Sequence, residues 1–180
     1  MATVEPIRNK ETIRKIEQNL KHETYRDYVL FLIGINSGLR ISDLLKLNVY
    51  DVKNRFYIKL IEQKTGKTKC FPINSKMRKV IKIFTKNRAL DEPLFMSKYK
   101  NRLDRITAYK IICKACKNVG IEENIGTHTL RKTFGYHFYK KYKDVAMLQK
   151  IFNHSNPSIT LRYIGIEQEE VYNCYKNFIL

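Results

Sequence analysis

Apolar residues recur at helical spacing along almost the whole chain, and this periodicity limits the fold more than any other feature. The stripes predict helices over about residues 10–23, 25–37, 42–47, 77–84, 104–118, 127–138, 145–152, 157–163 and 167–178. Gly38 is a plausible left-handed stop for the second of these. Asn156 followed by Pro157 has the order of a helix N-cap and first helical position.

Strict alternation of side chains occurs in one region only. Residues 56–61 read as a strand, residues 69–73 as the returning strand, and residues 64–67 as the turn between them. The predicted fold is therefore mainly α with a small antiparallel β-sheet (α+β). With 180 residues we expect a single domain over 1–180, with an N-terminal helical segment (about 1–22) and a C-terminal tail helix (167–180).

The charge balance favours a polyanionic partner. Lys and Arg number 35 against 17 Asp and Glu, so the net charge is 35 − 17 = +18. A plain basic surface is the alternative, but nucleic acid held through its phosphates is the preferred interpretation. The longest apolar run, residues 28–35, is too short to span a bilayer, and the N-terminus lacks a secretory signal, so we expect no membrane contact.

The four cysteines are predicted to be reduced thiols in a cytoplasmic protein. Cys113 and Cys116 form a C-x-x-C, but both fall on the apolar stripe of a predicted helix, with Ile106 and Tyr109. A zinc site needs four ligands, and no second pair completes one. Core thiols are preferred over a metal or redox site, and neither metal nor cofactor is predicted.

Two arginines stand where helices begin beside apolar residues. Arg40 follows the predicted stop at Gly38, and its guanidinium faces either Asp43 or a planar anion such as phosphate. His128 and Arg131 share one helix face at i, i+3 spacing, as either a half-buried polar pair or a proton-transfer group beside a fixed charge.

Three further residues complete the candidate set. His154 ends one predicted helix and Tyr163 lies near the end of the next, so both side chains can reach one opening; a surface histidine and a core tyrosine are the alternative. Lys64 lies in the hairpin turn, where a lysine is ordinarily solvated. The nearby Gly66-Lys-Thr is not a P-loop, because position 61 is Ile and a strand follows.

Taken together, these clusters resemble the catalytic domain of the tyrosine recombinases, the phage integrase family. The matching boxes are Ser37 to Leu44, the hairpin lysine, His128 to Arg131, and Asn153-His154 with a tyrosine nine residues later. The resemblance covers about residues 8 to 166 and implies the integrase catalytic-core fold, similar to type IB topoisomerase catalytic domains. Asn153 stands where the family usually has glycine. The sequence shows no counterpart of the family's usual N-terminal DNA-clamping domain, so we expect either an excised catalytic fragment or an unusually short natural enzyme.

The resemblance implies a site-specific recombinase that cuts and rejoins double-stranded DNA through a covalent 3′-phosphotyrosine, without metal or ATP. Its catalytic residues would be Arg40, Lys64, His128, Arg131, His154 and Tyr163, with Asp43 behind Arg40. Tyr163 is the nucleophile, His128 the base, Lys64 the acid, and the arginines with His154 neutralise the phosphate. Tyr172 and Tyr175 are interpreted as packing residues of the tail.

Three matters stay open at this point. A non-catalytic DNA-binding accessory module of the same fold, or a type IB topoisomerase-like relaxing activity, fits the same residues. Family members assemble on DNA, which implies a tetrameric synapse. The tail helix, with Val171, Tyr175 and Phe178, either packs on its own domain or docks on a neighbouring protomer.

Overall fold

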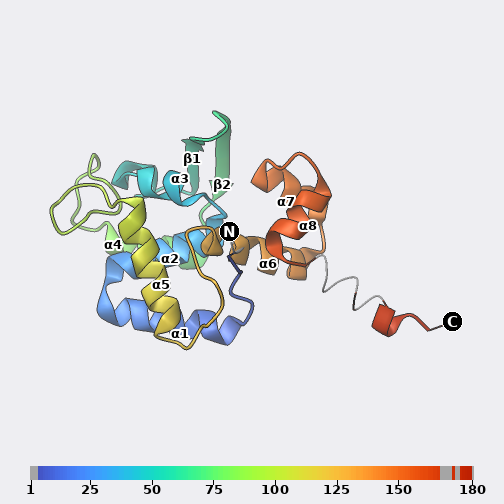
Figure 1. The fold of residues 1–180 in the computed structure, drawn as a ribbon. Coiled ribbons are helices and arrows are strands. Elements are labelled where there is room, and N and C mark those ends of the chain that lie inside the picture. The colour runs from blue at the N-terminus through green and yellow to red at the C-terminus, as the bar shows by residue number, and fades with distance from the viewer. Residues whose placement is uncertain (1–3, 167–171, 173–174, 180) are drawn as a thin grey trace.

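The protein is mainly helical, with one hairpin inserted after the third helix. The computed structural model describes residues 4–166, 172 and 175–179. Its elements, in chain order, are α1 (Lys10–Glu23), α2 (Tyr25–Ser37), α3 (Ile41–Lys46), a 3-10 turn (Val49–Asp51), β1 (Tyr57–Ile61), β2 (Thr68–Pro72), α4 (Ser75–Phe84), α5 (Arg105–Lys117), α6 (Thr129–Tyr142), α7 (Val145–Phe152) and α8 (Pro157–Ile164) (Figure 1). The predicted fold class is confirmed.

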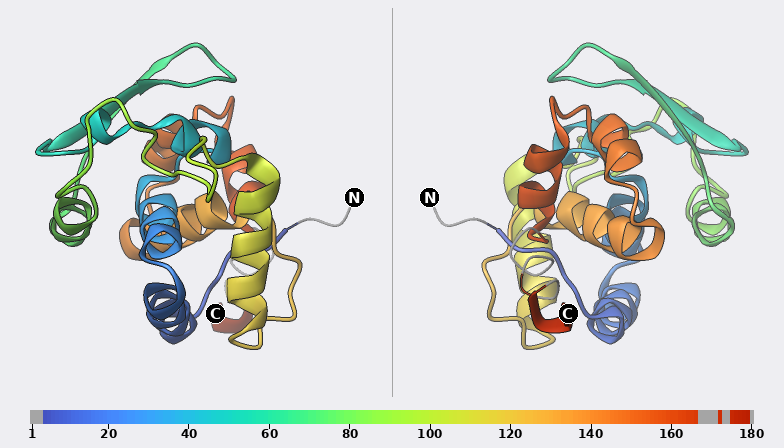
Figure 2. Two further views of the ribbon diagram at one scale, coloured as in Figure 1. Left: turned by 90° about the vertical axis from the view of Figure 1, so that its left-hand side faces the viewer. Right: turned by 90° about the vertical axis from the view of Figure 1, so that its right-hand side faces the viewer.

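The strands β1 and β2 form the antiparallel hairpin that the alternation predicts. Tyr57 lies opposite Pro72, and Ile61 lies opposite Thr68. Gly66 closes the turn in the left-handed conformation (φ 65°), and its N–H donates to the Glu62 carbonyl at 2.9 Å. The hairpin stands out beyond the helices (Figure 2).

Local signals place the helix ends that frame the site. α2 ends where Gly38 takes the left-handed conformation (φ 61°). A Cβ at this glycine would lie 2.6 Å from the Phe134 ring, so packing as well as φ requires glycine here. The Asn156 side chain accepts from the N–H of Ile159, and Pro157 occupies the first turn of α8, as predicted.

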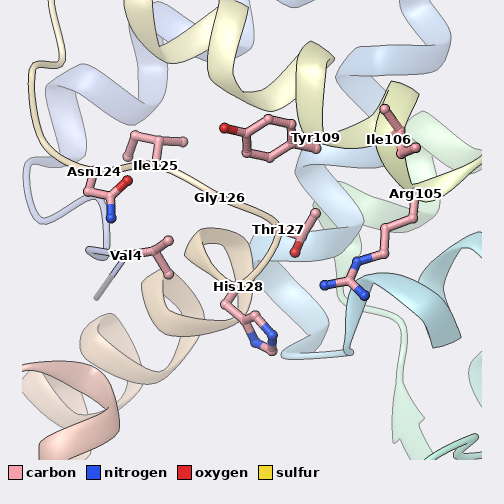
Figure 3. A pocket seen from close by; sticks show the side chains of 9 residues that line it. All are labelled: Val4, Arg105, Ile106, Tyr109, Asn124, Ile125, Gly126, Thr127 and His128. Carbon is pink, nitrogen blue, oxygen red and sulfur yellow. The ribbon is translucent and has the colours of Figure 1, made fainter. Parts of the chain in front are cut away.

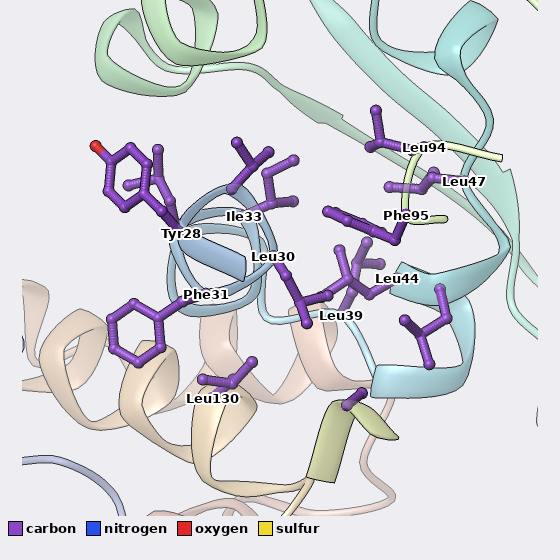
Figure 4. Packing of buried hydrophobic residues seen from close by; sticks show 14 of the residues in the cluster. Tyr28, Leu30, Phe31, Ile33, Leu39, Leu44, Leu47, Leu94, Phe95 and Leu130 are labelled. Carbon is purple, nitrogen blue, oxygen red and sulfur yellow. The ribbon is translucent and has the colours of Figure 1, made fainter. Parts of the chain in front are cut away.

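The main core is built around α2, which is buried on nearly all sides. α2 packs against α1, α4 and α6. Leu30 and Phe31 of this helix, Leu44 of α3 and Leu130 of α6 all contribute to the same buried cluster (Figure 4). Each fully buried side chain of this size contributes about 1.5–3 kcal/mol relative to exposure. Residues 30 to 44 are thereby held firmly, which fixes the start of α3.

A second, smaller cluster joins α6, α7 and α8. Its buried members are Tyr136, Leu148, Phe152, Ile164 and Ile166. Gly135 lets these helices approach closely, because a Cβ there would lie 2.6 Å from Ile164 and 2.8 Å from Phe152. This cluster positions the end of α8.

The cysteine predictions need correction. The buried face of α5 includes Ala108, Ile112 and Cys116, whereas Ile106, expected on the buried stripe, is 67% exposed. Burial raises the pKa of Cys116 to about 12, so its thiol is protonated. Of the two cysteines predicted as core thiols, Cys116 is buried and Cys113 is only half-buried, while Cys70 is exposed on β2. In the described part of the chain, no three His, Cys, Asp or Glu residues gather as metal ligands do.

Much of the predicted tail helix over 167–180, including Val171 and Cys174, lies outside the described residues. Tyr172 is 66% exposed and Tyr175 is 82% exposed, so the interpretation of both as packing residues is wrong. No helix in the described residues is both long enough and apolar enough to cross a bilayer.

Candidate active site

The hydroxyl of Tyr163 lies beside a histidine from another helix. Tyr163 is in the last turn of α8, and His128 is the residue before α6. Nδ1 of His128 lies 3.2 Å from the Tyr163 hydroxyl oxygen. Burial raises the pKa of Tyr163 despite the nearby charges of Arg131 and Arg40, so the phenol is protonated at neutral pH. Burial, with the charge of Arg105, lowers the pKa of His128, so its imidazole is neutral there and can accept a proton.

Arg131 is buried and joins three parts of the chain. Its guanidinium donates to the Gly38 carbonyl at the end of α2, and to the Phe152 carbonyl at the end of α7 at 2.8 Å. It also lies over the Phe152 ring at 4.3 Å from the centroid. The positive charge of Arg131 also favours the ionised form of Tyr163 and so partly offsets the effect of burial on the pKa of that phenol.

Arg40 meets two buried carboxylates. Its Nη1 lies 2.9 Å from Glu62 Oε1 and 3.9 Å from Asp43 Oδ2. None of these three atoms has an aligned hydrogen-bond partner among the described residues. Asp43 Oδ1 accepts from the Gln63 N–H at 2.9 Å, so this carboxylate ties the start of α3 to the hairpin. Asp43 lies behind Arg40, where the sequence predicted it.

His154 packs against the ring of Tyr163 and is held by a hydroxyl. The two ring centroids are 5.2 Å apart in an edge-to-face arrangement, and Nδ1 of His154 is 3.1 Å from Thr160 Oγ1. Burial, followed by the charges of Arg131, Arg40 and Lys64, lowers the pKa of His154 to about 4. His154 is therefore neutral at pH 7 before an anion arrives. When Thr160 donates to Nδ1, Nε2 carries the proton and can donate to a phosphate oxygen.

Lys64 is exposed at the tip of the hairpin. Its charge is one of those that lower the pKa of His154, which places the hairpin tip on the site's side of the molecule. Contacts and charges thus connect six predicted residues from four separate regions: Arg40, Lys64, His128, Arg131, His154 and Tyr163. The two guanidinium groups both act on Tyr163 instead of facing opposite sides of the protein.

Three residues of the site were missed in the sequence. Glu62 is buried beside Arg40, and Lys69 of β2 donates to the Ile151 carbonyl of α7 at 3.2 Å. Burial, with the charge of Arg131, lowers the pKa of Lys69 to about 8. Arg105 begins α5 and is the first charge acting on His128. The sequence offered one signal for Glu62, which is a glutamate beside residues typical of a β-strand. No local feature of the sequence marks Lys69 or Arg105.

A hollow of about 500 Å³ extends from His128 along α5. Figure 3 shows Arg105 and His128 at one end of it, projecting from the starts of α5 and α6, and Val4 and Asn124 at the other. Arg105 is exposed, so its guanidinium is available to an anion that enters beside the histidine.

One family model and one curated relative each match most of this chain. The model of the phage integrase family matches residues 8–170. The "Probable integrase/recombinase YoeC" of Bacillus subtilis is 48% identical over 179 residues, which is 99% of this chain and 98% of that protein.

Solved structures share the fold. The crystal structure of XerA recombinase superposes with a TM-score of 0.78 at 19% identity, over 98% of this chain and 64% of that one. A lambda integrase tetramer bound to a Holliday junction has a TM-score of 0.72 at 16% identity, over 91% of this chain and 49% of that one. The chain thus matches nearly the whole of YoeC but only part of the other two.

Proposed function

The chain belongs to the phage integrase family, the tyrosine recombinases, and we propose that it is a site-specific recombinase that cuts and rejoins DNA strands through Tyr163. The observation that supports this proposal best is the 3.2 Å contact between His128 Nδ1 and the Tyr163 hydroxyl, whose pKa also responds to the charge of Arg131. A buried, protonated phenol is a weak nucleophile by itself. A neutral imidazole within hydrogen-bond reach supplies the base that it needs.

The proposed reaction is a transesterification. The Tyr163 oxygen attacks the scissile phosphorus and gives its proton to His128 as the new oxygen–phosphorus bond forms. The bond from phosphorus to the 5′ oxygen breaks, and Lys64 protonates that oxygen. A 3′-phosphotyrosine and a free 5′-hydroxyl result, so the phosphodiester bond energy is kept and no ATP is consumed. Attack by a 5′-hydroxyl reverses every step and rejoins the DNA.

Charge stabilisation is assigned to the arginines. The transition state gathers negative charge on the non-bridging oxygens, and fixed cations in a partly buried site stabilise it strongly. Arg40 and Arg131 supply this charge without a metal in the proposed mechanism. His154 begins neutral and donates a hydrogen bond, which refines the expectation that all three residues act as cations.

The proposed partner is double-stranded DNA, bound by several copies of the chain. A net charge of +18 suits a polyanion, and the lambda integrase structure holds four copies on a junction. We also propose that residues 1–180 act as a single catalytic domain, and that the protein works in the cytoplasm. In such an assembly the exposed Tyr172, Tyr175 and Phe178 are available to dock on a neighbouring copy.

Trapping the covalent intermediate tests the proposal. A library of duplexes is randomised in sequence around a fixed nick. Where cleavage falls a few nucleotides 5′ of the nick, the short 5′-hydroxyl fragment diffuses away and the adduct accumulates. We expect a band on a denaturing gel that carries both protein and DNA, and a phosphotyrosine that mass spectrometry maps to Tyr163. Tyr163→Phe should form none, whereas Tyr172→Phe, a matched change at an exposed tyrosine, should form as much as the unaltered protein. Absence of any adduct would favour a non-catalytic accessory role.

A further inference from the structure

Glu62 is a carboxylate with no exposed surface, although it follows β1 directly and adjoins an exposed turn. Its two oxygens serve different partners. Oε1 lies 2.9 Å from Arg40 Nη1, while Oε2 accepts from Asn153 Nδ2 and from Thr65 Oγ1, both at 2.8 Å. A buried carboxylate is tolerated only when it is paired and hydrogen-bonded, and this one is both. One side chain therefore links the start of α3, the hairpin and the turn after α7.

Asn153 is the residue after α7 that donates to Glu62. It ends α7 in the left-handed conformation (φ 53°, ψ 43°), which glycine adopts freely and asparagine tolerates. The next residue is His154. A glycine would allow the same turn but could not reach Glu62, 91 positions away in the sequence. The Asn153 amide thus makes a contact with Glu62 that the left-handed turn does not require.

The groups around this link are mostly cationic. Burial raises the pKa of Glu62, but the hydrogen bonds from Thr65 and Asn153 and the charge of Arg40 outweigh it, so the pKa lies below its ordinary value. Lys69 also faces Glu62 and fastens β2 to α7 through the Ile151 carbonyl.

Arg131 and Asp43 are further charged groups that influence the pKa of Lys69. The ionised Glu62 carboxylate therefore lies among the cations Arg40, Lys69 and Arg131, next to the proposed phosphate site.

From this geometry we propose that Glu62 and Asn153 are a pair of positioning residues for strand cleavage, which align Arg40 and His154 on one phosphate. The inference rests on the function proposed above. Neither residue needs to touch DNA: Glu62 orients the guanidinium, and the Asn153 amide fixes the turn that carries the histidine. Loss of the amide should therefore slow the chemical step and leave DNA affinity nearly unchanged, because the cations that bind phosphate all remain.

Asn153→Gly is the first test. Glycine suits the left-handed turn, so the variant is expected to fold and to melt close to the unaltered protein. Its single-turnover cleavage of the nicked duplex at saturating protein should be about 10- to 100-fold slower, since small misplacements of reacting groups have effects of this size. The Kd for DNA should change by less than about twofold.

Thr65→Ala is the matched control. It removes the other hydrogen bond to the same Glu62 oxygen, but that bond lies within the hairpin and does not reach α7. We expect cleavage within about twofold of the unaltered protein. An equal loss in both variants would mean that the carboxylate needs any two donors, and would overturn the assigned link between elements.

Asn153→Asp separates positioning from a purely structural role. Aspartate also tolerates the left-handed turn, but it sets a second carboxylate against Glu62. Two adjacent carboxylates raise the pKa of one of them, and a shared proton then restores the bridge. The cleavage rate of Asn153→Asp relative to Asn153→Gly should therefore rise as the pH is lowered from about 8 to about 5. A constant ratio would contradict the proposal.

The outcomes also separate this inference from the proposed function. If the unaltered protein forms the adduct and Asn153→Gly forms it equally fast, the positioning pair is wrong and the recombinase assignment stands. If the unaltered protein forms no adduct at all, the assignment fails and the inference fails with it.

Discussion

His128 Nδ1 and the Tyr163 hydroxyl are 3.2 Å apart, although the first residue precedes α6 and the second lies at the end of α8. The contact depends on the small cluster around Phe152, which turns α8 back onto the start of α6. The geometry matches a base and the group that it deprotonates.

This contact predicts a pH-dependent cleavage rate. The pKa of His128 is lowered by burial, so the imidazole stays an acceptor at neutral pH and is protonated only below its ordinary range. Single-turnover cleavage should fall once the pH drops below the ordinary titration range of histidine, because a protonated imidazole cannot accept the phenol proton. His128→Gln should be about 10²- to 10⁴-fold slower at pH 7 and should lack that acidic limb. A variant that keeps the limb would assign it to another group.

Arg131 is predicted to stabilise the fold as well as the reaction. Arg131→Met keeps the bulk but leaves the carbonyls of Gly38 and Phe152 without their donor. We expect the free energy of unfolding in urea to fall by about 2–4 kcal/mol, together with loss of cleavage. Arg105→Met, at an exposed site, should change stability by less than about 0.5 kcal/mol. Similar losses in both would show that the two carbonyl contacts contribute little.

The lowered pKa of Lys69 predicts that the free energy of unfolding depends on pH. Its pKa is about 8 in the folded protein, against an ordinary value of 10.5, so between these values the unfolded chain binds more protons. Stability should therefore rise as the pH increases from about 8 to about 10.5. Lys69→Met should flatten this rise in thermal melts, whereas Lys67→Met, exposed on the same hairpin, should keep it. A rise that is unaltered in Lys69→Met would refute the assignment.

The close packing at Gly135 is predicted to affect both stability and the rate of DNA cleavage. An added methyl group would overlap Ile164 and Phe152, which costs about 1–3 kcal/mol. Gly135→Ala should therefore melt earlier and cleave more slowly, since α8 carries Tyr163. Gly34→Ala overlaps Leu130 in the main core instead and serves as the matched change. It should lower stability with little effect on the cleavage rate of the folded protein, and equal kinetic losses would contradict the coupling.

DNA affinity should fall steeply with salt, because binding releases counterions from the phosphates. Arg105 lies exposed beside the hollow next to His128. Arg105→Ala should reduce the slope of log Kd against log salt by about 1. Arg14→Ala, on α1 at the end of the molecule away from the hairpin (Figure 1), should leave the slope unchanged. Fluorescence anisotropy with a labelled duplex measures both, and a Kd independent of salt would contradict the polyanion interpretation.

Local signals were sufficient for most of the fold. The stop at Gly38 and the cap at Asn156 each depend on residues a few positions apart, so the sequence alone predicts them. The candidate residues were selected because their order and spacing along the chain resemble those of a known family, and their catalytic roles stay predictions. Which face of α5 is buried was not predictable in this way, since Ile106 and Tyr109 have the correct spacing yet lie beside the hollow.

The contacts between distant elements were missed for a physical reason. Glu62 meets Asn153, and Lys69 meets the Ile151 carbonyl, only because α6 and α7 return the chain to the hairpin. No periodicity within either segment reports such a meeting. The neutral state of His154 likewise depends on burial and on charges from three other regions, which a linear pattern does not contain.

The small cluster around Phe152 has a consequence for how the molecule moves. Tyr163 is anchored in this cluster and not in the main core around α2. Local opening needs less free energy than global unfolding, and a smaller buried surface opens sooner. Backbone amides of α7 and α8 should therefore exchange with solvent deuterium before those of α2. If this order of exchange is observed, the attacking group belongs to a part of the molecule that opens before α2, and it could withdraw from and return to the phosphate while the arginine beside α3 stays in place.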